Sequence, residues 1–177
     1  MNKTLFKEEQ RLNQWWIWLI WLVVIAFAVV PLWYGLYFQI TTGNSWGNDR
    51  TSNTELAVTA SLTTLISVGL ILLFTIPRLI VEIGDECICF RYPPLVRKWL
   101  VVPKSNIERY TVGKYNPIGE YGGWGVRLKS GKFGRAYSVS GNLGLRIYLK
   151  NGEIILLGTR KTKDISNAME KLMSVGE

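Results

Sequence analysis

The sequence lacks histidine entirely and contains only two cysteines among its 177 residues. Without histidine there is no imidazole general base, no serine–histidine triad and no histidine-ligated metal. Carboxylates such as Glu82, Glu108 and Glu120 are scattered along the sequence instead of being paired for acid–base work. We therefore expect a protein that is not an enzyme and needs no cofactor.

The two cysteines, Cys87 and Cys89, are separated by one residue and would share one face of a strand. Such close neighbours are poorly placed to form a disulfide with each other. One pair without histidine cannot supply the four ligands of a structural zinc site. We expect two reduced thiols that serve as small apolar side chains, and no metal site.

Charged residues are also absent from two long apolar runs, residues 15–39 and 56–76. A helix of about 20 apolar residues crosses the ~30 Å hydrocarbon layer of a bilayer, so each run predicts a transmembrane helix. Pro31 is expected to kink the first helix or to lie in its outer turn. Residues 1–77 thus form a first part that consists of an N-terminal tail and two spanning helices.

The first 14 residues mix charged and apolar side chains, which indicates a short helix at the membrane interface. A cleaved signal peptide is the alternative, because Ala26 and Ala28 form a small-x-small pattern typical of a cleavage site. The apolar run continues past Ala28, and the tail contains Glu8 and Glu9 beside its basic residues. These features favour an uncleaved helix.

Basic residues are concentrated after the second run. In residues 1–77 four basic and four acidic residues cancel, so the formal net charge of +8 belongs wholly to residues 78–177. The loop between the runs, residues 41–54, carries one arginine and one aspartate. The positive-inside rule then predicts a multi-pass protein of the cytoplasmic membrane, with both termini and residues 78–177 in the cytoplasm and the loop outside.

Small residues recur at helical spacing in the second run, and they are Ala60, Thr63, Thr64 and Ser67. Such a face lets helices approach closely in lipid, so we expect packing against the first helix or against a second copy. A solute pathway is the alternative. Neither run contains an ionisable residue of the kind that marks such a path, which favours anchors.

After Arg78 the hydrophobic pattern changes from helical to alternating. We predict strands over residues 79–83, 87–92, 97–102, 107–115, 125–128, 135–139, 143–149 and 153–157, and a helix over 162–173. Asn151 and Gly152 predict a two-residue type I′ turn, with Lys150 and Glu153 paired across it. The helix has an apolar stripe made of Ile165, Ala168, Met169, Leu172 and Val175. We expect an antiparallel β-barrel or sandwich of about seven strands, capped by that helix.

The strand succession from Leu79 to Leu157 with its closing helix resembles the bacterial pleckstrin-homology-like domain. The most similar stretch is Glu120-Tyr121-Gly122-Gly123-Trp124-Gly125, followed by Lys150-Asn151-Gly152-Glu153. Two helices directly before such a domain resemble a group of small bacterial membrane proteins without an assigned activity. The resemblance implies a pleckstrin-homology-like fold for residues 78–177.

In eukaryotic relatives of that domain, basic residues around the loop joining the first two strands hold an inositol-phosphate headgroup. Here we expect that loop to be Gly84-Asp85-Glu86, which is acidic. Anions need basic side chains or free N–H groups, so inositol-phosphate recognition is not expected at this loop.

Basic residues of the second part gather in three sets: Arg97, Lys98 and Lys104; Lys129, Lys132 and Arg135; and Arg160, Lys161 and Lys163. They either hold the domain against anionic lipid headgroups or form a solvated basic face. Glycine-rich phosphate loops are not supported, because Leu128 stands where a dinucleotide fingerprint needs its third glycine. We expect no nucleic-acid partner and identify no small-molecule substrate.

The sequence therefore predicts a non-catalytic, membrane-anchored module that binds another protein or its own copies at the cytoplasmic face. An anionic-lipid-sensing domain is the alternative. A component or accessory subunit of a membrane transport process is the third possibility.

Overall fold

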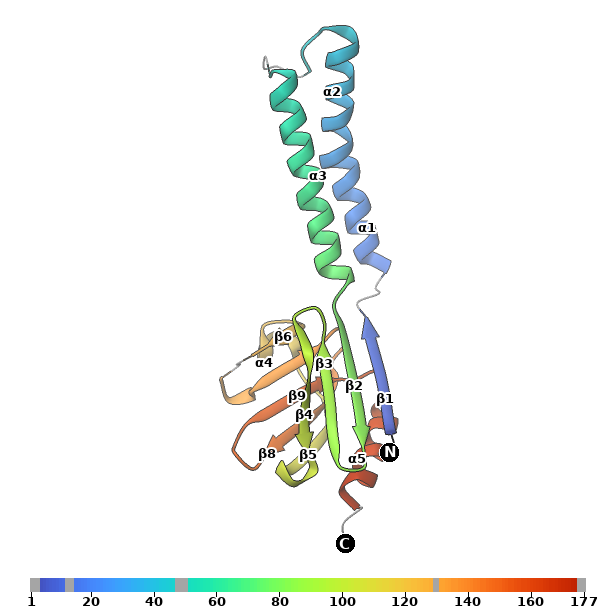
Figure 1. Ribbon diagram of the computed structural model, residues 1–177, viewed down its shortest axis with the longest axis vertical. Coiled ribbons are helices and arrows are strands. Elements are labelled where there is room, and N and C mark those ends of the chain that lie inside the picture. Colours follow the sequence, from blue (N-terminus) through green and yellow to red (C-terminus); the bar gives the residue numbers. More distant parts are fainter. Residues whose placement is uncertain (1–3, 12–14, 47–50, 129–130, 175–177) are drawn as a thin grey trace. The chain divides into compact units, whose positions relative to one another are not determined.

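The computed structural model describes residues 4–11, 15–46, 51–128 and 131–174. The chain divides into two compact units. One unit, Asn13–Thr75, is helical, and the other joins Met1–Leu12 to Ile76–Glu177 and contains the β-sheets (Figure 1).

The helical unit confirms two long apolar helices. The first consists of α1 (Trp15–Val24), the π-helical turn η1 (Ile25–Val29) and α2 (Val30–Thr42), and the second is α3 (Asn53–Thr75). Both are long and apolar enough to cross a membrane. Pro31 lies at the start of α2, directly after η1. A π-helical turn is a common way to accommodate a break in the regular hydrogen-bond ladder, such as the one that proline causes.

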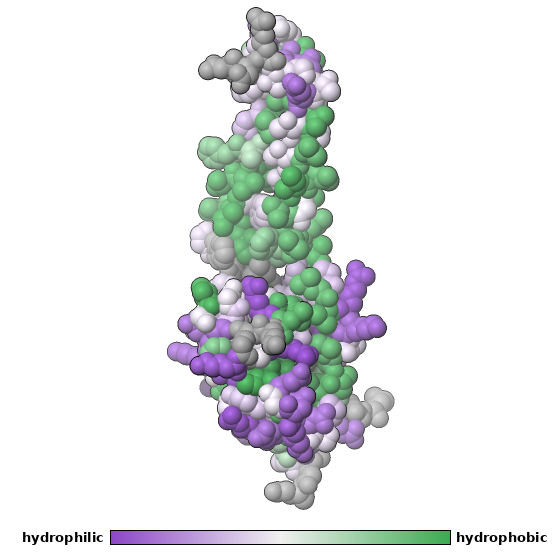
Figure 2. Space-filling view, turned by 90° about the vertical axis from the view of Figure 1, so that its left-hand side faces the viewer, coloured by the Kyte–Doolittle hydropathy of each residue, from purple (hydrophilic) through white to green (hydrophobic). Residues whose placement is uncertain are grey.

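Large apolar side chains cover the outside of these helices. Leu22, Phe27 and Leu65 are 67%, 81% and 69% exposed. Figure 2 shows hydrophobic residues over most of the helical unit, with hydrophilic ones gathered near the loop between the helices. An apolar surface of this extent is unfavourable in water and matches a lipid environment.

The loop between the helices packs back onto α2. The indole ring of Trp46 makes edge contacts with Tyr34 and Phe38, at centroid distances of 5.3 and 5.7 Å. Ser52 and Glu55 then form a reciprocal capping box at the start of α3, since each accepts a hydrogen bond from the other's backbone N–H. Trp46 is therefore part of the packing of the helical unit.

The β unit contains two sheets and a C-terminal helix (Figure 1). The four-stranded sheet has the order β1 (Thr4–Arg11), β2 (Arg78–Gly84), β3 (Cys87–Tyr92) and β4 (Val96–Pro103). The five-stranded sheet has the order β5 (Ile107–Lys114), β8 (Leu143–Leu149), β9 (Ile154–Gly158), β7 (Arg135–Ser138) and β6 (Gly125–Arg127).

The N-terminal tail is where the structure differs most from expectation. The predicted interfacial helix is wrong for Thr4–Arg11, because these residues form β1 and pair antiparallel with β2 from Thr4↔Gly84 to Arg11↔Arg78. Pairing gives the backbone of β1 its hydrogen bonds and buries Phe6. The tail therefore belongs to the β unit, and the helical unit is inserted between two neighbouring strands.

All eight strands predicted after Arg78 are confirmed, and their ends shift by at most one residue. The expectation of a purely antiparallel arrangement is wrong for one pair, because β7 runs parallel to β9. The turn at Asn151 also differs. Gly152 alone has a positive φ, of 81°, and Leu149 N–H donates to Glu153 O, so this is a three-residue loop with glycine in the left-handed position.

The core of the β unit lies between the two sheets and the helix α5 (Thr162–Ser174). The predicted apolar stripe of that helix is confirmed for its four described members, since Ile165, Ala168, Met169 and Leu172 are all buried in this core. The fifth, Val175, lies outside the described residues. From the first strand the core takes Phe6, whose partner strand β2 contributes Leu79, Val81 and Ile83.

Candidate functional site

One end of the β unit is defined by the points where the chain leaves for the helices and returns. Arg11 is the last residue of β1, and its cross-strand partner Arg78 is the first residue of β2. Arg78 N–H donates to Pro93 O at 3.1 Å, which fixes the β3–β4 turn at the same end. We call the surroundings of Arg11, Arg78, Pro93, Ser140 and Arg160 the exit end.

Arg160 ties the remaining segments of the exit end together. Its guanidinium Nη2 donates to Arg11 O at 3.1 Å and to Ser140 Oγ at 2.8 Å. Trp124 belongs to the same end, because its indole Nε1 donates to Gly141 O at 2.7 Å. The start of α5 and the β7–β8 loop therefore lie beside the last residue of β1.

Two buried polar side chains of β1 form hydrogen bonds with the segment that precedes α5. Glu8 is 6% exposed and accepts hydrogen bonds from Thr159 Oγ1 at 2.6 Å and from Arg160 N–H at 2.9 Å. Gln10 is 1% exposed and its Nε2 donates to Gly158 O at 2.7 Å. These bonds connect the N-terminal strand to the segment between β9 and α5. The sequence does not predict a role for either residue.

Glu8→Ala is expected to lower the free energy of unfolding by about 2–4 kcal/mol, because the Thr159 hydroxyl and the Arg160 N–H would lose the carboxylate that accepts their hydrogen bonds. Thermal unfolding of the purified protein in detergent measures this, with a fall in Tm of roughly 10 °C or more. Glu9→Ala is the matched control on the exposed face of the same strand. Its surface ion pairs with Arg11 and Arg78 contribute less than about 1 kcal/mol. Equal effects of the two substitutions would contradict the buried role of Glu8.

Glu9 lies between the two arginines on the outer face of this end. Its Oε1 accepts from Arg11 Nε and from Arg78 Nη1, both at 3.0 Å. These hydrogen bonds lower the pKa of the Glu9 carboxyl below its ordinary value. The carboxylate is therefore ionised at neutral pH, and it offsets part of the positive charge of the two arginines.

The nine basic residues singled out from the sequence do not form one surface. Two groups lie at the exit end: Arg97 and Lys98 follow the β3–β4 turn, while Arg160 and Lys161 precede α5 and Lys163 lies in its first turn. Lys104 lies at the opposite end of its sheet, since its N–H donates to Glu86 O beside the β2–β3 turn. Lys129 is outside the described residues.

The two remaining basic residues are engaged within the β unit. Arg135 forms an ion pair with Glu153 at 2.8 Å. The prediction that Glu153 pairs with Lys150 is therefore wrong. The Lys132 ammonium lies 5.2 Å from the centroid of the Phe133 ring.

Apolar side chains are exposed among the basic ones at the exit end. Leu95, at the tip of the β3–β4 turn, is 64% exposed, and Trp99 and Trp124 are 39% and 44% exposed. The Arg91 guanidinium stacks over the Trp99 ring at 4.5 Å. The combination of exposed leucine, tryptophan and basic side chains is typical of a surface that meets a membrane interface.

The small residues of the second helix pack within the chain. Ala60 is fully buried and Ser67 is buried, while Thr64 Oγ1 accepts a hydrogen bond from Trp33 Nε1 at 2.9 Å. The hydroxyls of Thr64 and Ser67 donate to backbone carbonyls one turn earlier. Thr63 is half-buried. Within one chain, this face packs against the first helix through the bond between Trp33 and Thr64.

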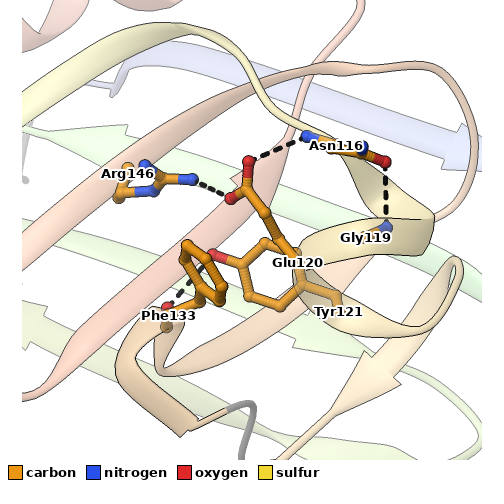
Figure 3. Close-up of polar contacts among 6 residues, drawn as sticks. All are labelled: Asn116, Gly119, Glu120, Tyr121, Phe133 and Arg146. Atoms are coloured by element: carbon orange, nitrogen blue, oxygen red, sulfur yellow. Dashed lines mark hydrogen bonds and ion pairs between the residues drawn. The ribbon is translucent and has the colours of Figure 1, made fainter.

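A second polar cluster fastens the short helix α4 (Pro117–Tyr121) onto the outer face of the five-stranded sheet (Figure 3). Glu120 accepts from Arg146 on β8 and from Asn116 N–H, and Tyr121 Oη donates to Phe133 O at 3.1 Å. These bonds tie the helix to β8 and to Phe133, so we regard the cluster as a clamp for Pro117–Tyr121.

No model of a known protein family matches the sequence, and no curated protein matches it. Function is therefore inferred from the geometry of the exit end.

Proposed function

We propose that the protein is a non-catalytic module anchored in the cytoplasmic membrane by its two helices. In this proposal the exit end of the β unit contacts anionic lipid headgroups on the cytoplasmic side. The fold in this proposal is pleckstrin-homology-like. It is supported by a four-stranded sheet, a second sheet and a closing helix whose apolar stripe enters the core between them.

The observation that carries the proposal is the hydrogen bond from Arg78 N–H to Pro93 O. Only Ile76 and Pro77 separate Arg78 from the end of α3. With at most ~3.6 Å of chain per residue, a spanning α3 would tether Arg78 close to the membrane surface. The β3–β4 turn, bound to Arg78, then lies near the headgroups together with Leu95, Arg97 and Lys98.

Headgroup contact also explains why basic and apolar side chains mix at this end. Each basic residue near an anionic leaflet contributes about 1 kcal/mol to membrane attraction. Leucine and tryptophan side chains gain from entering the interfacial layer, where tryptophan is enriched. The acidic turn at Gly84-Asp85-Glu86 does not oppose this, because it joins β2 to β3 at the opposite end of the sheet.

The proposal predicts that Lys98→Glu with Lys161→Glu weakens contact of the exit end with anionic bilayers. Two reversed charges change the contact free energy by at least about 2 kcal/mol, or roughly 30-fold in the equilibrium constant. Hydrogen–deuterium exchange of residues 93–99, in nanodiscs with and without anionic lipid, measures the contact as protection that depends on lipid charge.

The matched control reverses Lys150 and Lys171, which are exposed. Lys171 lies in the last turn of α5, whereas Arg160 and Lys161 precede its first turn. Lys150 N–H donates to Asn106 O beside the turn that holds Lys104. Arg160 is left unchanged because its side chain supports the fold. Equal loss of protection in both double variants, or protection independent of lipid charge, would overturn the proposal.

Binding of another protein is the second candidate. It is favoured by strand β4, which ends the order of its sheet and exposes Trp99 and Val101. Crosslinking in native membranes from a residue on β4 would test it through the mass of the captured species.

A helix-mediated self-assembly has less support, because Ala60 and Ser67 are already buried within the helical unit. A transport role also has less support, because the Thr64 and Ser67 hydroxyls bond to their own helix backbone.

A further inference from the structure

The two cysteines form a thiol pair on the outer face of the four-stranded sheet. Along β3, Ile88, Phe90 and Tyr92 point into the core, while Cys87, Cys89 and Arg91 alternate with them on the opposite face. The Sγ atoms of Cys87 and Cys89 are 3.5 Å apart, and both cysteines are free and half-buried. The pair is therefore reachable from solvent and preformed by the pleat of one strand.

Among the described residues, neighbours from two strands flank the pair. Cys89 lies between Glu82 on β2 and Val101 on β4, and Cys87 lies beside Pro103. Glu82 is held by Lys7 at 2.7 Å. Across the described parts of the chain, no three cysteine or acidic side chains gather in a group that could hold a metal ion.

We propose that Cys87 and Cys89 bind one thiophilic monovalent metal ion of the copper(I) class, in two-coordinate form, through both sulfurs. Each thiol loses its proton to solvent as its sulfur bonds to the ion, so the ion keeps its oxidation state and no oxidant or reductant takes part. This site is independent of the proposed headgroup contact, and it goes beyond the two inert thiols expected from the sequence.

The geometry fits a single ion shared by the two sulfurs. Thiolate–metal bonds are about 2.3 Å long for zinc, so sulfurs 3.5 Å apart can both reach one ion. Small rotations of the two side chains widen the angle toward the linear arrangement of two-coordinate copper(I). Because the pair projects from a sheet face, these rotations leave the core side chains of β3 in place.

The ligand set selects the kind of ion. Zinc takes four ligands in structural protein sites, whereas soft thiolates alone favour copper(I), which two of them can satisfy.

The test uses the full chain in detergent under anaerobic conditions, titrated with copper(I) buffered by a chromophoric copper(I) chelator. We expect one ion per chain, with an ultraviolet thiolate-to-copper charge-transfer band. Cys87→Ser and Cys89→Ser alone should each weaken binding at least 100-fold, and the double variant should not compete with the chelator. Thermal unfolding checks that the serine variants keep their fold.

A second measurement needs no variant. Bound copper(I) should protect both thiols of the unaltered protein from alkylation by iodoacetamide, which mass spectrometry detects as the loss of two adducts. Failure to compete with the chelator, or alkylation unchanged by copper(I), overturns the site. Retention of copper by the double serine variant also overturns it. Half an ion per chain with a doubled particle mass overturns the two-coordinate site within one chain.

Discussion

A fragment that begins at Arg78 should fail to fold, whereas the same fragment with residues 4–11 joined to it should fold without the helices. Arg11 and Arg78 are direct cross-strand partners at the end of an antiparallel pair. An Asn-Gly turn placed between them therefore converts β1 and β2 into an ordinary hairpin. The joined chain then contains every strand and the helix of the β unit.

The expected difference is large because β1 closes both the core and a polar network. Loss of the buried Phe6 ring alone costs about 3–5 kcal/mol. Without Glu8, the buried Thr159 hydroxyl and the Arg160 N–H lose their partner, which costs about 1–3 kcal/mol for each group. The total is comparable with the 5–15 kcal/mol that stabilises a typical domain.

Urea unfolding followed by far-ultraviolet circular dichroism measures the outcome. The joined chain should unfold cooperatively, and the fragment from Arg78 onward should show no cooperative transition. The control is the joined chain with Phe6→Asp, which keeps the length and the turn but places a charge in the core. Equal stability of the fragment and the joined chain would contradict the role of β1.

The N-terminal strand was hidden in the sequence because its inward face is mostly polar. Its buried residues are Phe6, Glu8 and Gln10, so the alternation that identifies a half-buried strand is absent. Its partner strand follows the entire helical unit, and no local pattern reports that pairing. By contrast, the strand at Leu143–Leu149 and the helix α5 are each recognisable from the spacing of their own apolar residues. The predictions of this strand and this helix were both confirmed.

The prediction that Gly84-Asp85-Glu86 joins the first two strands is therefore wrong. The acidity of that turn was the reason not to expect inositol-phosphate recognition. With β1 in the sheet, the first two strands are β1 and β2, and the helical unit connects them. The acidic turn therefore says nothing about headgroups at the exit end.

The candidate site was predictable in its composition and not in its arrangement. Sequence clusters identified the basic residues, but hydrogen bonds between distant segments decide which of them share an end. Arg160 bonds to Arg11 and Ser140, whereas Arg135 bonds to Glu153. The turn at Asn151 is a second example, because Glu153 pairs with Arg135 on β7 and not with the neighbouring Lys150.

Gly134→Ala should be among the most destabilising single substitutions in the β unit. Gly134 has a φ of 77°, and a Cβ there would lie 2.2 Å from Ile154 O and 2.7 Å from Ile154 Cβ. The left-handed backbone costs an L-residue about 1–2 kcal/mol. Pushing β7 and β9 apart to relieve the clash costs about 1–3 kcal/mol more. We expect a loss of roughly 3–4 kcal/mol in the free energy of unfolding.

Gly141→Ala is the matched control, because Gly141 has a φ of 80° and no atom within 4 Å of the added Cβ. It should lose only the backbone cost of about 1–2 kcal/mol. Urea unfolding of the joined chain gives both values, and equal losses would contradict the close approach of Gly134 to Ile154. That approach exists because β7 runs parallel to β9, with Arg135 opposite Ile155. The difference between the two alanine variants therefore tests the pairing of β7 with β9, which is parallel where the sequence predicts antiparallel strands.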